Sequence, residues 1–263
     1  MMPHEIVERM SKLCHYDEPC ACYISGGLDS TIVLHHLVEN GMAVKAFTAS
    51  FDERTLIEDM KIINRLSSHY KVITEIIWIK DIIPEFPEIQ RHLPQPRYNV
   101  WPWWLARAVH ADGFKTAFVG EGADEIFGGY NDRSYLEAWA SQIEYIRRTW
   151  DVLHAVHDVK IVAPFSELNS FKMANYFHPP NKQFLRDAYR GILPDFVIDR
   201  PAEPPHYANY RSLWERELKN YFPPCEDISV VEIKRLLQLF VTRVWLNVHE
   251  IMELERSNSA FHS

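Results

Sequence analysis

The chain has 263 residues, of which 47% are hydrophobic, and its net charge is −8. This length and hydrophobic content suffice for one substantial core. Nucleic-acid-binding proteins usually carry a basic face, whereas the 28 Lys and Arg residues here are scattered among 36 acidic ones. No apolar run reaches the roughly 18 residues that a membrane span requires. The composition therefore argues against nucleic-acid and membrane partners.

The cysteines and the N-terminus predict the cellular setting. The four cysteines form no C-x-x-C pair and have no metal-binding spacing: Cys14, Cys20, Cys22 and Cys225. Cys20 and Cys22 lie in an apolar run, where a thiol behaves as a small hydrophobic side chain. The N-terminus lacks the charged-then-apolar pattern of a secretion signal. We therefore expect a reduced, cytoplasmic protein.

Helical and strand patterns alternate along the first half of the chain. Apolar residues at helical spacing predict helices over Pro3–Leu13, Thr31–Glu39, Leu56–Leu66 and Trp103–Ala111. Apolar and β-branched runs predict strands at Cys20–Tyr23, Lys45–Ser50, Lys71–Ile79 and Lys115–Val119. This alternation predicts an α/β protein whose parallel sheet is covered on both faces and binds ligands at the carboxyl ends of its strands.

Two further stretches do not follow this alternation of strands and helices. Residues 82–102 contain five prolines, so we expect an extended loop there, with aromatic side chains that either line a pocket or hold the loop down. The second half of the chain is expected to be mostly helical. Its predicted helical segments are Asn131–Asp158 and an amphipathic Val231–Glu250.

The first motif follows the first predicted strand. An apolar run ends in Ser25-Gly-Gly-Leu-Asp-Ser30, and the helical pattern begins at once. A strand, a glycine turn and a helix start present backbone N–H groups and a positive dipole end to a phosphate. Ser25 and Ser30 can add hydroxyl donors, whereas Asp29 would repel a bare phosphate unless a cation lay between them. The motif therefore predicts a magnesium–nucleotide site that lacks the Gly-Lys-Ser/Thr of a Walker loop.

The second motif follows the fourth predicted strand. Here Gly120-Glu-Gly-Ala-Asp-Glu-Ile-Phe-Gly-Gly-Tyr130 again joins a strand, a glycine turn and acidic residues at a helix start. If the two strands are neighbours in the sheet, Asp29 and Asp124 lie around one site.

Both motifs also have a purely structural interpretation. The first can be an ordinary strand-to-helix turn in which Asp29 and Ser30 cap the helix. In the second, Glu121, Asp124 and Glu125 can simply stabilise a helix N-terminus through its dipole. The spacing alone leaves both interpretations open.

Taken together, the two motifs resemble the asparagine synthetase family of the PP-loop (N-type) ATP pyrophosphatases. Ser-Gly-Gly-Leu-Asp-Ser is the PP-loop signature, and Gly-Glu-Gly-Ala-Asp-Glu-x-Phe-Gly-Gly-Tyr is specific to the family. Softer matches extend the resemblance over nearly the whole chain, at Leu105–Gly113, Val162–Glu167, Lys182–Arg186 and Leu193–Pro194.

The resemblance implies a domain organisation. It implies a parallel five-stranded HUP-like (PP-loop ATP pyrophosphatase) sheet flanked by helices, with a mostly helical C-terminal half. Residues 1–130 would form the nucleotide-binding core, and residues 131–263 would complete the substrate site. Because the synthetase-like part begins close to Met1, we expect a single domain over 1–263 and no N-terminal glutaminase domain.

The resemblance also implies an ATP-dependent, amide-forming synthetase. A carboxylate, aspartate by default, would attack the α-phosphorus of ATP and release pyrophosphate, and ammonia or another amine would then displace AMP. The ATP-binding residues implied are Ser25, Gly26, Gly27, Leu28, Asp29, Ser30, Phe47 and Gly120. Mg²⁺ would be bound by Asp29 and Asp124. Catalysis would fall to Glu121, Lys182 and Arg200, and substrate binding to Glu121, Glu125 and Arg186.

The sequence departs from the family at the residues of the amide-forming step. Where the family reads Arg-x-Lys, this chain reads Arg200-Pro-Ala202, and a methyl group cannot supply an ammonium. Arg200, His206 or Lys182 would have to take the charge-stabilising role, or the chemistry is altered. Without a glutaminase domain, the nitrogen would come from free ammonia, another amine, or a separate glutaminase or ammonia-supplying subunit.

Two other classes of function remain open. One is a non-catalytic or altered-specificity nucleotide-binding homologue, which the change at Ala202 favours. The other is a PP-loop enzyme that modifies a nucleobase or tRNA. Sulfur-transferring members of that class need catalytic cysteines, and none of the four here has the right setting; the acidic charge also argues against tRNA.

Overall fold

One parallel sheet forms the centre of the protein. The computed structural model describes residues 3–50, 53–129, 144, 146–168, 182–201, 214–221 and 228–260. The strands are β1 (Cys20–Tyr23), β2 (Val44–Ser50), β3 (Ile73–Trp78), β4 (Thr116–Phe118) and β5 (Lys160–Val162). Their order is β3-β2-β1-β4-β5, and every neighbouring pair is parallel. The predicted five-stranded parallel sheet flanked by helices is confirmed.

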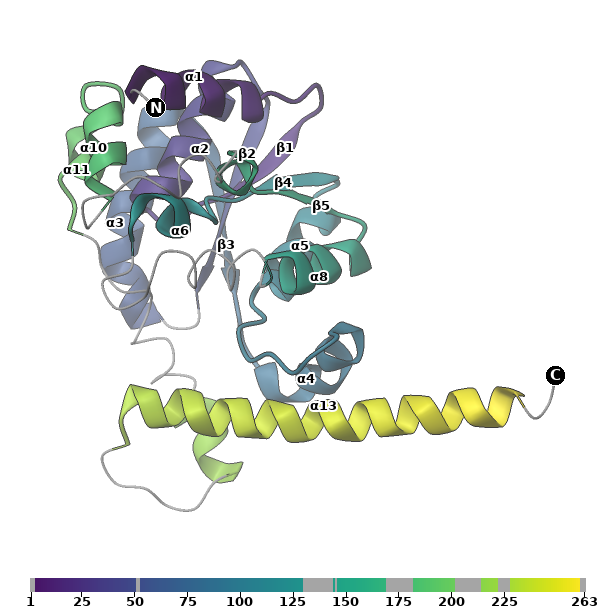
Figure 1. Cartoon of the computed structure of the whole chain (residues 1–263). Helices are drawn as coiled ribbons and strands as arrows, with labels where there is room; N and C mark the ends of the chain where they lie inside the picture. The colour runs from purple at the N-terminus through teal and green to yellow at the C-terminus, as the bar shows by residue number, and fades with distance from the viewer. Residues whose placement is uncertain are drawn as a thin grey trace.

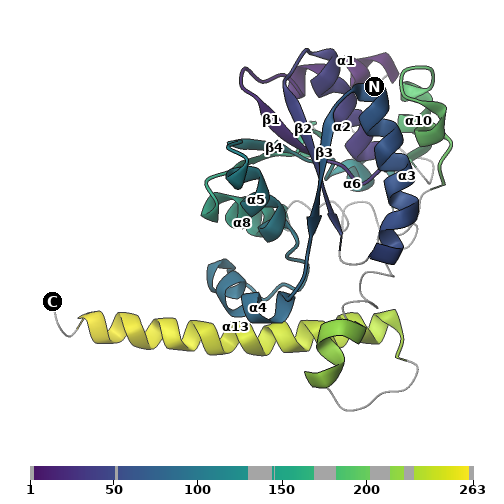
Figure 2. The ribbon, with the colours of Figure 1, turned by 180° about the vertical axis from the view of Figure 1, so that it is seen from behind.

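Helices cover both faces of this sheet (Figures 1 and 2). One face carries α1 (Pro3–Leu13), α2 (Leu28–Glu39), α3 (Glu53–Tyr70), α10 (Gln183–Tyr189) and α11 (Asp195–Ile198). The other face carries α5 (Pro102–Ala111) and α8 (Asp151–Val156). Side chains on a strand alternate between faces, so Cys20 and Cys22 of β1 pack toward the first group while Ala21 and Tyr23 pack toward the second.

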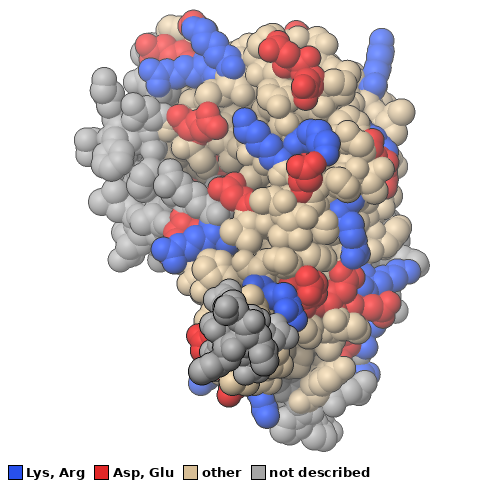
Figure 3. All heavy atoms as spheres, turned by 90° about the vertical axis from the view of Figure 1, so that its right-hand side faces the viewer, with Lys and Arg blue, Asp and Glu red and all other residues tan. Residues whose placement is uncertain are grey.

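Several further described elements are short. They are α6 (Ala123–Phe127), α9 (Pro164–Glu167), the π-helix η1 (Ile146–Trp150), the π-helix η3 (Trp214–Leu218) and the 3-10 helix η4 (Lys219–Tyr221). The helix predicted over 131–158 is observed at 146–156, and residues 131–143 lie outside the described part of the chain. None of the described helices combines the length and apolar character that a membrane crossing requires. Basic and acidic side chains are interspersed on the face that Figure 3 shows.

The predicted extended loop over residues 82–102 is wrong at its start, where α4 (Ile82–His92) forms. The buried apolar side chains of α4 recur at helical spacing, at Ile82, Phe86 and Ile89. Pro84 lies in the first turn, where its missing N–H has no helical partner in any case. Pro87 costs one hydrogen bond inside the helix. Burial of the apolar stripe therefore outweighs the proline content.

A long C-terminal helix packs on α4. This helix, α13, spans Val230–Ala260 and is longer than the predicted Val231–Glu250. Its fully buried residues, Ile233, Leu237 and Val241, share a core cluster with α4. Trp245 donates an Nε1–H hydrogen bond to the carbonyl oxygen of Leu93 at 2.8 Å. Figure 1 shows α13 continuing past α4 toward the C-terminus.

Two buried histidines link segments that are far apart in the sequence. His154 Nδ1 lies 2.8 Å from the Trp150 carbonyl oxygen, and His154 Nε2 lies 2.8 Å from the Tyr23 hydroxyl. A carbonyl oxygen can only accept, so Nδ1 carries the proton and Nε2 accepts from Tyr23. His36 Nε2 lies 2.7 Å from the Tyr189 hydroxyl. Burial lowers the pKa of His36 and of His154 to about 4.

We therefore expect the protein to lose stability on acidification. In the unfolded chain both histidines take up a proton near pH 6.5, whereas in the folded protein they resist it until about pH 4. Each should contribute up to about 3 kcal/mol that is present above pH 6.5 and lost as the pH falls toward 4. Urea unfolding over this pH range measures the effect.

The matched control compares a buried with an exposed histidine. His154→Gln should flatten the pH dependence of the unfolding free energy, whereas His15→Gln, at a side chain that is 63% exposed, should not. An unchanged slope in His154→Gln would show that the buried imidazole does not cause the acid sensitivity.

Candidate functional site

The loop after β1 leads directly into a helix. Pairing with β2 continues one residue beyond β1, because Ile24 N–H donates to the Phe47 carbonyl at 2.9 Å. Gly26 then adopts a left-handed conformation with φ of 76°, which favours glycine. The helix α2 begins at Leu28, three residues before its predicted start. The first motif therefore supplies both the turn and the first helical turn, as a phosphate-binding loop does.

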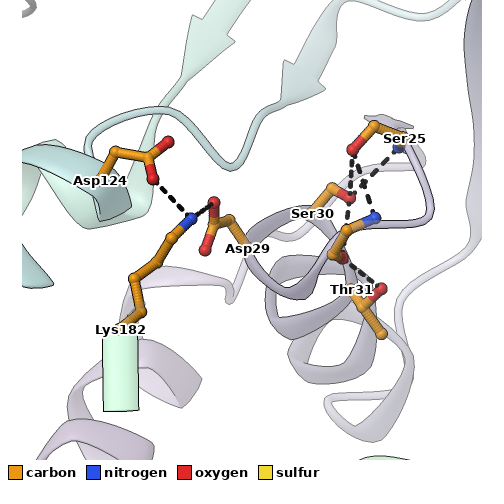
Figure 4. Close-up of polar contacts among 7 residues, drawn as sticks. Ser25, Asp29, Ser30, Thr31, Asp124 and Lys182 are labelled. Carbon is orange, nitrogen blue, oxygen red and sulfur yellow. Dashed lines mark hydrogen bonds and ion pairs between the residues drawn. The ribbon is translucent and has the colours of Figure 1, made fainter. Parts of the chain in front are cut away.

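The serine hydroxyls of the first motif close the loop on itself. The Ser25 N–H donates to Ser30 Oγ at 3.2 Å, and the Gly27 N–H donates to Ser25 Oγ at 3.4 Å. The Ser30 and Thr31 hydroxyls donate to the Gly27 carbonyl at 3.3 and 2.7 Å (Figure 4). No side chain caps α2 at Gly27. The interpretation of Asp29 and Ser30 as helix caps therefore does not describe this turn.

The second glycine turn lies against the first. β1 and β4 are neighbours, with Cys22 in register with Phe118, so the loops that follow them emerge side by side. A Cβ on Gly120 would lie 2.7 Å from the Ser30 nitrogen and 2.8 Å from the Asp29 carbonyl carbon. Only glycine permits this approach, so Gly120 of the second motif packs directly on the backbone of Asp29 and Ser30.

Lys182 bridges the two aspartates of the motifs. Its Nζ lies 2.5 Å from Asp29 Oδ2 and 2.7 Å from Asp124 Oδ1 (Figure 4). Lys182 is 8% exposed and stands at the N-cap of α10 in a left-handed conformation with φ of 54°. Asp29 and Asp124 therefore converge on one position, as predicted, and an ammonium occupies that position.

The charges of this cluster act on one another. Burial raises the pKa of Asp29 to about 6; the Asp124 carboxylate adds to the rise, and Lys182 opposes it. Burial lowers the pKa of Lys182, but the two carboxylates outweigh burial and leave it raised. Lys182 therefore stays a cation. Asp29 Oδ1 is buried and has no hydrogen-bond partner among the described residues.

The unpartnered oxygen of Asp29 suits a divalent cation. Mg²⁺ is typically held by one or two carboxylates, with phosphate oxygens and water completing its shell. Asp29 and Asp124 supply two carboxylates beside a phosphate-type loop. Within the described residues, no group of three His, Cys, Asp or Glu side chains forms a site of its own. The residues present therefore fit a cation shared with a nucleotide rather than a metal held by protein alone.

Two arginines lie near the first motif. Arg200 donates an Nη1–H hydrogen bond to the Gly26 carbonyl at 3.2 Å, so its guanidinium lies on the loop. Arg186 is buried and donates to the Ile198 carbonyl, which ties α10 to α11. Its positive charge also reaches Asp29. The cluster thus gathers three cationic side chains around the loop, although the net charge of the protein is negative.

The other predicted site residues have different surroundings. Glu121 is half-buried at the second turn, and its carbonyl accepts from Ser166 Oγ at 3.5 Å. Glu125 is buried within α6. The Phe47 side chain packs edge-to-face on Phe114 in the core, so a contact with adenine would come from its backbone. Ala202 and His206 lie outside the described residues.

From the sequence, Lys182 is predicted only as a catalytic residue that could stabilise charge, and its position between the two aspartates is not predicted. Lys182 is 153 residues from Asp29, and no local pattern indicates a contact over that separation. The Tyr23–His154 pair is missed for the same reason. A buried strand that places a tyrosine two residues before the Ser25 turn is the only available signal.

The fold and the site define an α/β protein with a glycine–serine phosphate-type loop at the point where strand order reverses. A family model described as Asparagine synthase matches residues 4–171. This match covers more than half of the chain, so the chain belongs to the asparagine synthase family.

Individual relatives match only in part. The chain is 31% identical over 134 residues to an amidase, chry2, of Gibberella zeae, which covers 44% of this chain and 20% of that protein. It is 28% identical over 118 residues to asparagine synthetase [glutamine-hydrolyzing] 1 of Bacillus subtilis, and this alignment covers 44% of this chain and 19% of that protein. The matches thus span about a fifth of the length of these relatives.

A solved NH3-dependent NAD synthetase from Campylobacter jejuni also aligns with the chain. The alignment covers 95% of this chain and 97% of that one, at 12% identity and a TM-score of 0.36.

Proposed function

We propose that the protein is an ATP-dependent amide-forming synthetase. It would adenylate a carboxylate, with aspartate as the default, and release pyrophosphate. Ammonia or another amine would then displace AMP to give the amide. Residues 1–130 would bind the nucleotide, and residues 131–263 would complete the substrate site within one domain.

The convergence of Asp29 and Asp124 carries this proposal. Two carboxylates from adjacent strand ends meet at one cation position beside a glycine–serine loop. A structural turn would not need a second acidic loop against it, nor an unpartnered buried carboxylate oxygen. Membership of the asparagine synthase family supports ATP as the nucleotide.

The adenylating half of the site would act through fixed positive groups. Backbone N–H groups at Gly26 and Gly27, with the hydroxyls of Ser25 and Ser30, would hold the departing pyrophosphate. Arg200 lies on the same loop and would add charge to this cradle. When bound, Mg²⁺ would neutralise charge on the leaving group, with Asp29 and Asp124 as its protein ligands.

The amide-forming half needs a proton acceptor and a cation. Glu121 is the candidate general base for the amine, because it lies in the turn that packs against the first motif. Lys182 and Arg200 are the described cations that would take the role of the missing family lysine. Free ammonia, another amine, or a separate glutaminase or ammonia-supplying subunit would provide the nitrogen.

Exchange of labelled pyrophosphate into ATP tests the first half-reaction alone. With Mg²⁺, ATP and no amine, one carboxylic acid from a panel that includes aspartate should stimulate exchange. An enzyme that forms an acyl-adenylate reverses that step without needing the second substrate. Exchange that never depends on any carboxylate would contradict the proposed substrate class.

Lys182 favours one second candidate, a non-catalytic nucleotide-binding protein. An ammonium already fills the position between the two carboxylates. If it never leaves, the protein would bind nucleotide without cleaving it. Nucleotide binding without pyrophosphate exchange would support this candidate.

A further inference from the structure

The C-terminal helix α13 has two apolar faces, and only one of them is covered. Ile233, Leu237 and Val241 are fully buried toward α4. On the other side, Leu239, Leu246 and Leu254 are 58%, 55% and 59% exposed. Their spacing of seven and eight residues places them along one stripe of the helix. We name these three leucines the outer stripe.

The outer stripe lies on the face of α13 that turns away from α4, since Trp245 and His249, on other faces of the same helix, contact Leu93 and Gln90. Figures 1 and 2 show α13 running past α4, with no described element beside its C-terminal end. Exposed Arg243 and Glu250 lie between the leucines on the same side of the helix. Along this side of the helix the order of residues is therefore Leu239, Arg243, Leu246, Glu250 and Leu254.

This order is complementary to itself in one orientation only. An antiparallel second helix, centred between Leu246 and Asn247, places Leu239 opposite Leu254 of the second copy. The same register places Arg243 opposite Glu250 of the second copy, and the two Leu246 side chains meet near the centre. A parallel pair would instead place Arg243 against Arg243 and Glu250 against Glu250, and like charges in contact repel.

We propose that α13 pairs antiparallel with α13 of a second copy of this chain through the outer stripe. The interface has two-fold symmetry, as most homodimer interfaces do, and each half contributes the same leucines and the same ion pair. Charged residues at the seam fix the orientation and register at some cost in stability. The inference is independent of the proposed catalytic function.

Sedimentation equilibrium of the full chain and its variants tests this arrangement. The wild type should dimerise reversibly, and Leu246→Glu should be monomeric over the same concentrations. Arg243→Glu should raise the dimer dissociation constant at least about tenfold, because it replaces two attractive pairs with two repulsive ones. The double variant R243E/E250R should restore dimerisation, since the swapped charges again meet opposite charges.

Controls separate this interface from others and from misfolding. Arg235→Glu makes the same charge change on the same helix but lies opposite no charged residue in this register, so its dimer should match the wild type. Circular dichroism should show all variants folded, because the altered side chains are exposed. A wild type that is monomeric at every concentration overturns the proposal. So does a dimer that Leu246→Glu leaves intact, or a double variant that stays as weak as Arg243→Glu.

Discussion

Replacing Asp29 with asparagine is expected to reduce ATP–pyrophosphate exchange at least about 100-fold, the scale of losing one preorganised electrostatic group. Asp29 has one carboxylate oxygen on Lys182 and a second that is buried without a described partner. The amide of asparagine keeps the shape of the side chain but removes its charge. Exchange assayed with the best carboxylate measures the effect.

Asp158→Asn is the matched control for this variant. Asp158 forms a surface ion pair with Lys115 and is 77% exposed, so the same change there should leave exchange unaltered. Circular dichroism should show that Asp29→Asn is folded, because Lys182 keeps Asp124 as a partner. Near-normal exchange in Asp29→Asn would remove Asp29 from the reaction.

Replacing Lys182 with methionine is expected to lower the unfolding free energy by about 3 kcal/mol. The change leaves Asp29 and Asp124 facing each other without the cation that they share. The Lys182 ammonium repels a divalent cation that would bind the same two carboxylates, so the two cations compete. Millimolar Mg²⁺ should therefore raise the melting temperature of Lys182→Met more than that of the wild type, in the absence of nucleotide.

The control here is Lys115→Met, which removes a lysine from an exposed ion pair with Asp158. Exposed pairs contribute at most about 1 kcal/mol, so this variant should stay close to the wild type in stability and in its response to Mg²⁺. If Lys182→Met were as stable as Lys115→Met, the buried bridge would not be a significant interaction. Equal Mg²⁺ responses in Lys182→Met and the wild type would show that the lysine does not compete for the site.

The sequence predicts the sheet and the pairing of the two motifs because both depend on local patterns. Alternation of strands and helices dictates a parallel sheet, and two glycine turns at strand ends meet when those strands are neighbours. The observed register of β1 with β4 places Asp29 and Asp124 as expected. Long-range side-chain contacts do not follow from local patterns. The bridge from Lys182 to the two aspartates depends on how α10 packs on α1 and α6.

Helix boundaries show a second limit of sequence reasoning. Prolines in Ile82–His92 suggest a loop, yet the apolar stripe packs against α13, a partner more than a hundred residues later in the chain. Leu28 begins α2 earlier than predicted, and in this first turn both the N–H and the hydroxyl of Thr31 donate to the Gly27 carbonyl. Tertiary packing accompanies the first difference and local hydrogen bonds the second. The spacing of apolar residues along the sequence indicates neither of them.

The position at which ATP is cleaved tests the proposed function most directly. The protein is incubated with ATP, Mg²⁺, ammonia and the carboxylate that stimulates exchange, and the nucleotides are then separated by chromatography. This measurement distinguishes cleavage of ATP to AMP and pyrophosphate from cleavage to ADP and phosphate. The paired carboxylates beside the Ser25–Ser30 loop predict AMP and pyrophosphate in equal amounts. Formation of ADP and phosphate instead would contradict the adenylation mechanism.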